Sequence, residues 1–162
     1  MKKVPGVETA STNVVTVLSI GSEVENQTAL KHVFGQSEWT MCPNFKWKLT
    51  TKPTLDSALT VLRNKRIPVV LCECGPQRDT WKEALERFSR LPAPPFVIVT
   101  SRLADERFWV EALNLGAYDV LATPLDTTEV TRVVSSAWLH WRGLQAPSIP
   151  PQSYKRLSVS AA

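Results

Sequence analysis

Cysteine and histidine are scarce in this chain, and their positions argue against several kinds of site. The three cysteines, Cys42, Cys72 and Cys74, are odd in number and show no Cys-x-x-Cys spacing. The sequence therefore predicts reduced thiols rather than a disulfide framework or a thiol redox motif. The two histidines, His32 and His140, lack the neighbours that a catalytic triad or a metal site needs. We expect neither an enzyme nor a resident metal or cofactor.

Long apolar runs are also missing. No stretch reaches the roughly 18 apolar residues of a membrane-spanning helix, and residues 1–13 lack the apolar centre of a secretory signal. We therefore expect a cytoplasmic protein that has no membrane partner.

Acidic and basic side chains are nearly equal in number within residues 14–142, the part of the chain that we expect to fold. Residues 14–142 include 15 basic and 14 acidic side chains, so most of the net charge of +4 comes from residues near the two ends. A DNA-binding domain would show a basic face. Trp47 between Lys46 and Lys48 could stack on a base, but a single triplet of this kind is weak evidence. We expect no nucleic-acid partner.

The most informative stretch, residues 95–126, contains a strand, a helix, a second strand and the start of another helix. Residues 96–99 form a continuous apolar run that ends at Thr100, as is typical of a parallel strand covered on both faces. Residues 118–122 predict the next strand, which leads into Pro124.

A helix is predicted between these two strands. Asp105 and Glu106 place negative charge in its first turn, and Gly116 ends it. Phe108, Ala112 and Leu115 have the spacing of an inward face.

The rest of the chain predicts the same alternation. Strands are expected over residues 14–20, 45–49 and 67–72, and helices over residues 25–34, 55–62 and 81–90. The expected N-caps are Thr54, Asp79 and Asp126, the last in a capping box with Glu129. Five strands alternating with five helices predict a doubly wound α/β fold with a parallel sheet and right-handed crossovers.

Three features of residues 95–126 resemble the receiver (CheY-like) domain of bacterial two-component response regulators. They are Thr100 after a strand, the helix end at residues 112–117, and Thr123-Pro124 ahead of Asp126. The resemblance covers about residues 14–142 and implies a five-stranded parallel sheet in the flavodoxin-like order 2-1-3-4-5. Residues 1–13 are then a flexible N-terminus, and residues 143–162, rich in Pro and Ser, a disordered tail.

The chain departs from the family at the residues that carry its chemistry. In a working receiver, an Asp after the third strand accepts a phosphoryl group, an acidic pair after the first strand helps to hold Mg²⁺, and a Lys precedes the Pro. Glu73 is the nearest match to the acceptor, with Cys72 as another alignment, whereas Gly21 and Ser22 replace the acidic pair and Thr123 replaces the Lys.

Two family features are retained. Thr100 stands at the switch position, and Pro124 follows a peptide bond that is cis in the family. Glu73 has two interpretations: its longer side chain could mimic the phosphorylated state by bonding to Thr100, or it could be a solvated carboxylate at a strand end.

The departures favour a degenerate receiver (pseudo-receiver), a stand-alone signalling module that acts through protein binding. The alternative is a phosphoacceptor receiver in a two-component phosphorelay, which would need Mg²⁺ and for which a histidine kinase is the candidate partner.

Trp109 and Leu113 form a second apolar stripe on the fourth helix. In receivers, the fourth helix, fifth strand and fifth helix form a dimer and partner surface, so these two residues are interface candidates, for a homodimer among other partners. Otherwise they pack at the edge of the domain.

Overall fold

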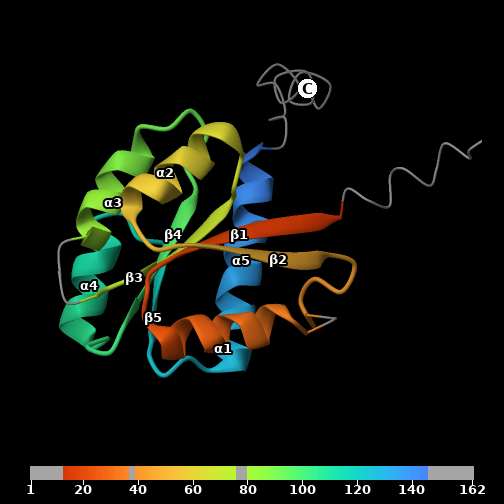
Figure 1. Ribbon diagram of the computed structural model, residues 1–162, viewed down its shortest axis with the longest axis horizontal. Coiled ribbons are helices and arrows are strands. Elements are labelled where there is room, and N and C mark those ends of the chain that lie inside the picture. Colours follow the sequence, from red (N-terminus) through yellow and green to blue (C-terminus); the bar gives the residue numbers. More distant parts are fainter. Residues whose placement is uncertain (1–12, 37–38, 76–79, 146–162) are drawn as a thin grey trace, which may run out of the picture.

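Strands and helices alternate along the part of the chain that the computed structural model describes, residues 13–36, 39–75 and 80–145 (Figure 1). In chain order the elements are β1 (Val14–Ile20), α1 (Val24–Phe34), β2 (Lys46–Lys52), α2 (Leu55–Asn64), β3 (Val69–Glu73), α3 (Thr80–Ser89), β4 (Phe96–Ser101), α4 (Glu106–Asn114), β5 (Asp119–Ala122) and α5 (Thr127–Gln145). The strands are parallel and ordered β2-β1-β3-β4-β5. The doubly wound fold and its strand order are confirmed.

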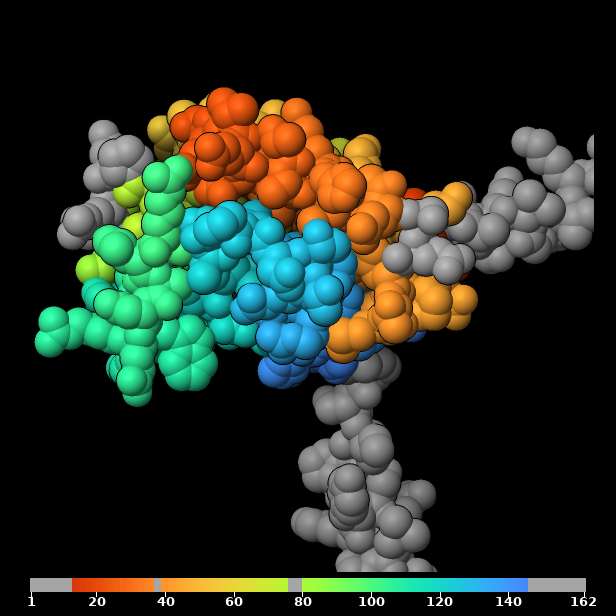
Figure 2. All heavy atoms as spheres, turned by 90° about the horizontal axis from the view of Figure 1, so that it is seen from below, coloured from red at the N-terminus to blue at the C-terminus, as the bar shows by residue number. Residues whose placement is uncertain are grey.

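Helices cover both faces of the sheet. On one face, α1 and α5 pack over Val17, Val69 and Leu71, and Figure 2 shows α1 in orange-red beside α5 in cyan and blue. On the other face, α2, α3 and α4 pack over side chains that include Leu18 and Val70. The central strands are therefore buried on both sides, which accounts for their continuous apolar runs.

Three helices begin at side-chain caps, of which Thr54 and Asp126 were predicted from the sequence, whereas Asp105 was expected inside the first turn of its helix. Thr54 and Ser57 form a reciprocal capping box at the start of α2. The carboxylate of Asp105 accepts from the backbone N–H of Phe108 at the start of α4, and that of Asp126 accepts from Glu129 at the start of α5. Each bond satisfies an N–H that the helix itself leaves unpaired.

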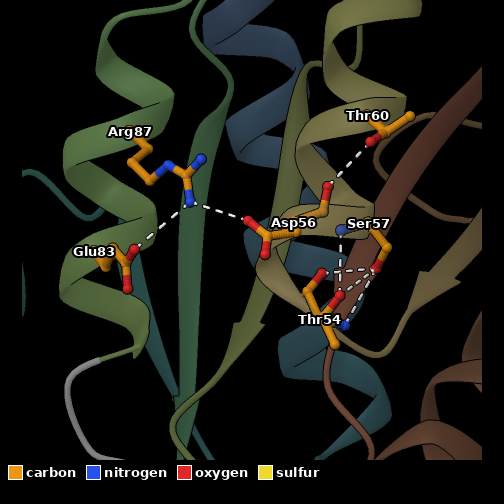
Figure 3. Close-up of polar contacts among 6 residues, drawn as sticks. All are labelled: Thr54, Asp56, Ser57, Thr60, Glu83 and Arg87. Carbon is orange, nitrogen blue, oxygen red and sulfur yellow. Dashed lines mark hydrogen bonds and ion pairs between the residues drawn. The ribbon is translucent and has the colours of Figure 1, made fainter.

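Polar contacts also join α2 to α3 (Figure 3). Arg87 on α3 lies 3.2 Å from Asp56 on α2 and 3.6 Å from Glu83 on its own helix. In Figure 3 the Arg87 side chain lies between these two carboxylates, and the Thr54 cap lies on the far side of Asp56.

The end of α4 corrects one expectation. Gly116 has a φ of 106°, and Ala117 N–H bonds to the Ala112 carbonyl at 2.9 Å, as in a Schellman motif. Leu115, expected on the inward face, is instead 49% exposed. The helix ends at Asn114, so Leu115 lies in the turn that follows and faces solvent.

Two element boundaries were also wrong. β2 runs to Lys52 rather than to residue 49, because all seven of its residues pair with β1. α5 runs to Gln145, so the expected tail does not begin at residue 143; Pro147 is the first residue beyond it that cannot continue a helix. The predictions for residues 1–12, for residues 146–162 and for Asp79 as a cap lie outside the described residues.

None of the helices within the described ranges is both long and apolar enough to cross a membrane.

Candidate functional site

The sheet brings the expected site residues together at the carboxyl ends of its strands. Glu73 at the end of β3 is the register partner of Thr100 on β4, and β1 ends on the other side of β3. Gly21, Ser22 and Thr123 line the same groove as these two residues. These residues lie at the edge of the sheet where its strands end, the edge at which doubly wound sheets form their ligand sites.

The carboxylate of Glu73 is held by three donors at the start of α1. Its Oε1 accepts from the backbone N–H of Glu23 and from Nδ2 of Asn26, each at 3.2 Å. Its Oε2 accepts from Nε2 of Gln27 at 3.3 Å. Gln27 in turn contacts the hydroxyl of Ser19 on β1.

Glu73 therefore acts as a cap for α1 from a distant part of the chain. Glu23 occupies the N-cap position, but its side chain makes no capping bond. The N-terminus of a helix carries unpaired N–H groups and a partial positive charge, and a carboxylate there is stabilising. The Glu73 carboxylate supplies that negative charge from β3.

Gly21 provides the space that this carboxylate occupies. A Cβ at residue 21 would lie 1.4 Å from Oε2 of Glu73 and 2.4 Å from its Cδ. No acidic side chain can therefore stand at residue 21 while Glu73 keeps this position.

A second carboxylate, that of Glu23, links α1 to the segment after β4. It forms an ion pair with Arg102 and accepts from Nδ2 of Asn26 at 3.0 Å. In Figure 2 the green segment between β4 and α4 extends toward the orange-red α1. The ion pair joins two sides of the groove.

Burial raises the pKa of the Glu73 carboxyl above its ordinary value. The bonds from Asn26, Gln27 and the Glu23 backbone oppose that effect by stabilising the charged form, whereas the neighbouring Glu23 carboxylate adds to it.

The donor set does not fit Mg²⁺, which requires several oxygen ligands in near-octahedral geometry. Gly21 and Ser22 offer no carboxylate, the Glu23 carboxylate is paired with Arg102, and both oxygens of Glu73 already accept hydrogen bonds. No group of three or more His, Cys, Asp or Glu side chains that could hold a metal occurs in the described ranges.

In the described structure Thr100 gives no hydrogen bond to the Glu73 carboxylate, although the sequence suggested one as an interpretation of Glu73. Thr100 is only 3% exposed. The carboxylate points toward β1 and α1, because the donors and the free space lie on that side. Thr123 Oγ1 is buried without a partner in the described structure, and the Thr123–Pro124 bond has the cis geometry that the resemblance implies.

Asn26, Gln27 and Arg102 were missed as site residues. Asn26 gave a usable signal in the sequence, because its spacing of four residues from Leu30 puts a polar side chain on the inward face of α1. The structure shows that this side chain is buried. A buried amide needs partners, and here they are two carboxylates.

The aromatic residues divide into buried and exposed sets. Trp47 is buried and stacks on Trp39 with ring centroids 4.2 Å apart, so it is not available to stack on a base. Trp109 on α4 is 45% exposed, and its Nε1 donates to Oδ1 of Asp119 at 3.1 Å. Leu113 is partly buried, and Val110 beside it is exposed.

Comparisons with solved structures show the fold of this chain. The signal receiver domain of an HD domain-containing protein from Pseudomonas fluorescens Pf-5 has a TM-score of 0.64 at 18% identity, covering 80% of this chain and 98% of that one. The receiver domain of the Francisella response regulator 1452 gives 0.63 at 19%, covering 78% and 98%. A Thermotoga maritima response regulator gives 0.65 at 16%, covering 76% and 97%. No family model and no curated protein sequence matches this chain. The chain thus has the receiver fold.

Proposed function

We propose, from the receiver fold and the state of its strand-end site, that this chain is a signalling module whose output is protein binding and whose phosphoacceptor position is degenerate. The observation that carries the proposal is the position of the Glu73 carboxylate, which caps α1 and fills the space above Gly21.

A phosphoacceptor carboxylate has to attack an incoming phosphoryl group, and the negative charges of the two must be offset by cations. Both oxygens of Glu73 are engaged, and the neighbouring Glu23 carboxylate pairs with Arg102, so neither carboxylate is free to hold a divalent cation. Lys82 and Arg102 line the groove, but each pairs with a carboxylate, that of Glu111 and that of Glu23. Arg87, the third cation among the described residues of the groove, pairs with Asp56, so the groove keeps an excess of acidic side chains.

The output surface in this proposal is α4 together with β5 and α5. Ala112 is the only fully buried residue of α4, and the helix leaves Trp109 and Val110 exposed beside the partly buried Leu113. Exposed aromatic and aliphatic side chains on one helix are typical of a protein-binding surface. Binding through this surface takes the form of a homodimer or of a complex with another signalling protein.

A second function, phosphoacceptor in a phosphorelay with a histidine kinase, has one observation in its favour. Glu73 and Thr100 are register partners at the edge of an open groove, so a phosphoryl group on Glu73 would lie near a hydroxyl.

One experiment separates the two functions. The protein is incubated with acetyl phosphate and Mg²⁺ beside an active receiver as positive control, and intact masses are measured. We expect no phosphoryl adduct on the wild-type chain. An adduct that is lost in Glu73→Gln and kept in the matched control Glu25→Gln, which changes another α1-region carboxylate, would show a working phosphoacceptor and refute the proposal.

A further inference from the structure

The edge strand β2 presents unpaired backbone groups. Within the described structure β2 pairs with β1 alone. Lys46 N–H bonds to the Asn13 carbonyl at 2.8 Å, and Gly21 N–H bonds to the Lys52 carbonyl at 3.0 Å. Even-numbered residues of β2 therefore direct their backbone groups toward β1. The N–H and C=O groups of the odd-numbered residues, 47, 49 and 51, point away from the sheet.

The side chains of β2 alternate in chemistry as well as in direction. Trp47 and Leu49 pack in the cluster under α1 and α5. Lys46, Lys48 and Lys52 therefore lie on the opposite face, the one that α2 covers. Lys46 and Lys48 are exposed there.

More positive charge lies where α2 leads into β3. Arg63, Lys65 and Arg66 are exposed at the edge of the sheet where the strands begin. The ion pairs found among the described residues use other cations, namely Lys82, Arg87, Arg90 and Arg102. Within the described ranges no ion pair neutralises these cations, so the field beside the first half of β2 is positive.

We propose that the free edge of β2 binds an extended segment of a protein partner in which acidic residues alternate with apolar ones. Such a segment would add a sixth strand through the outward backbone groups of β2. Its side chains on one face would meet Lys46, Lys48 and Lys52, and those on the other face would lie beside Leu49 and the edge of the α1 layer. Opposite charges across a strand pair are stabilising and like charges are destabilising.

The same lysines select against other occupants. Lysine on an edge strand is a common device against unwanted strand pairing. An acidic segment can still pair with β2, because its carboxylates offset the charge of the lysines. Pairing between two copies of β2 would bring lysine beside lysine, so a second copy of this chain is disfavoured.

The test uses a synthetic peptide of alternating valine and glutamate, with a valine–lysine peptide of equal length as its counterpart. Binding is followed by amide hydrogen exchange of the isotopically labelled protein in NMR spectra. We expect the glutamate peptide to bind and to slow exchange at Trp47, Leu49 and Thr51, without the same change at the amides already bonded to β1.

Charge reversal in Lys46→Glu/Lys48→Glu should weaken the binding of the glutamate peptide about tenfold or more and strengthen the binding of the lysine peptide. The matched control Arg107→Glu/Arg132→Glu changes two exposed cations on α4 and α5 and should bind like wild type. Circular dichroism checks that both variants are folded.

Three results would overturn the proposal. One is equal binding of the two peptides. Another is binding without protection of the three outward amides. The third is protection of those amides in the free protein, which would mean that the edge is already covered by this chain or by a second copy of it.

Discussion

At the scale of single residues, the Glu73 carboxylate occupies the volume that a side chain at residue 21 would need. The glutamate Oε2 lies where a Cβ on residue 21 would be, and its hydrogen bonds come from α1. Gly21 does not have a positive φ, so alanine is compatible with the backbone there. A substitution at residue 21 acts through Glu73 and not through backbone strain.

We expect Gly21→Ala to lower the free energy of unfolding by about 1–3 kcal/mol, because the Glu73 carboxylate would lose its bonds to Asn26 and Gln27. In a Glu73→Ala background the same change should cost much less, about 0.5 kcal/mol or below, since the obstacle is gone. Urea unfolding of the four proteins of this double-mutant cycle measures the coupling. Equal costs in the two backgrounds would contradict the assigned contact.

The helices of this fold obtain their N-terminal partners from different distances along the chain. α2 is capped by Thr54, immediately before the helix, whereas α1 depends on Glu73, about fifty residues later. Local caps can be identified from short sequence patterns. The cap of α1 exists only after β1 and β3 have paired.

At the level of elements, the local cap of α2 should contribute more than the ion pairs that join α2 to α3. Thr54→Ala removes the capping box and should cost about 1 kcal/mol. Arg87→Ala removes two surface ion pairs and should cost about 0.5 kcal/mol or less, with no effect at high salt. Urea unfolding at low and high NaCl compares the two variants. A larger loss for Arg87→Ala at both salt concentrations would be the opposite of this expectation.

For the molecule as a whole, the α4 surface should control self-association more than stability. Trp109 is half-exposed, so Trp109→Ser should change the melting temperature little. If it is the anchor of a homodimer, its loss should weaken the dimer by about 2 kcal/mol, or about thirtyfold in Kd. Sedimentation velocity over a range of concentrations measures this.

The matched control for that experiment is Val24→Ser, which removes an exposed apolar side chain from α1. A wild-type chain that remains monomeric at every concentration, or a Trp109→Ser variant that associates as strongly as wild type, would exclude a homodimer through α4.

The sequence predicts the architecture well because its signals are local. Apolar strand runs, helical spacing and the glycine at residue 116 each act within a few residues, and together they specify the order of elements. The ends of β2 and α5 were missed since they depend on pairing with β1 and on how far a helix continues before Pro147.

The site was predictable as a neighbourhood but not as a set of contacts. Strand topology places Gly21, Glu73 and Thr100 at one edge whatever their side chains do. The direction of the Glu73 side chain depends on donors from α1 and on the space above Gly21. Such long-range arrangements leave no periodic trace in a sequence.

The shared volume of Gly21 and Glu73 also shapes the evolutionary paths open to this chain. An acidic residue at 21, as a receiver that binds a divalent cation would have, collides with Glu73 as it now lies. Shortening Glu73 first would remove the cap of α1 before any new carboxylate had replaced it. Each single step is unfavourable, although the double change is sterically permitted. We therefore expect the two positions to be epistatic, so that a carboxylate at residue 21 is tolerated only when residue 73 changes with it.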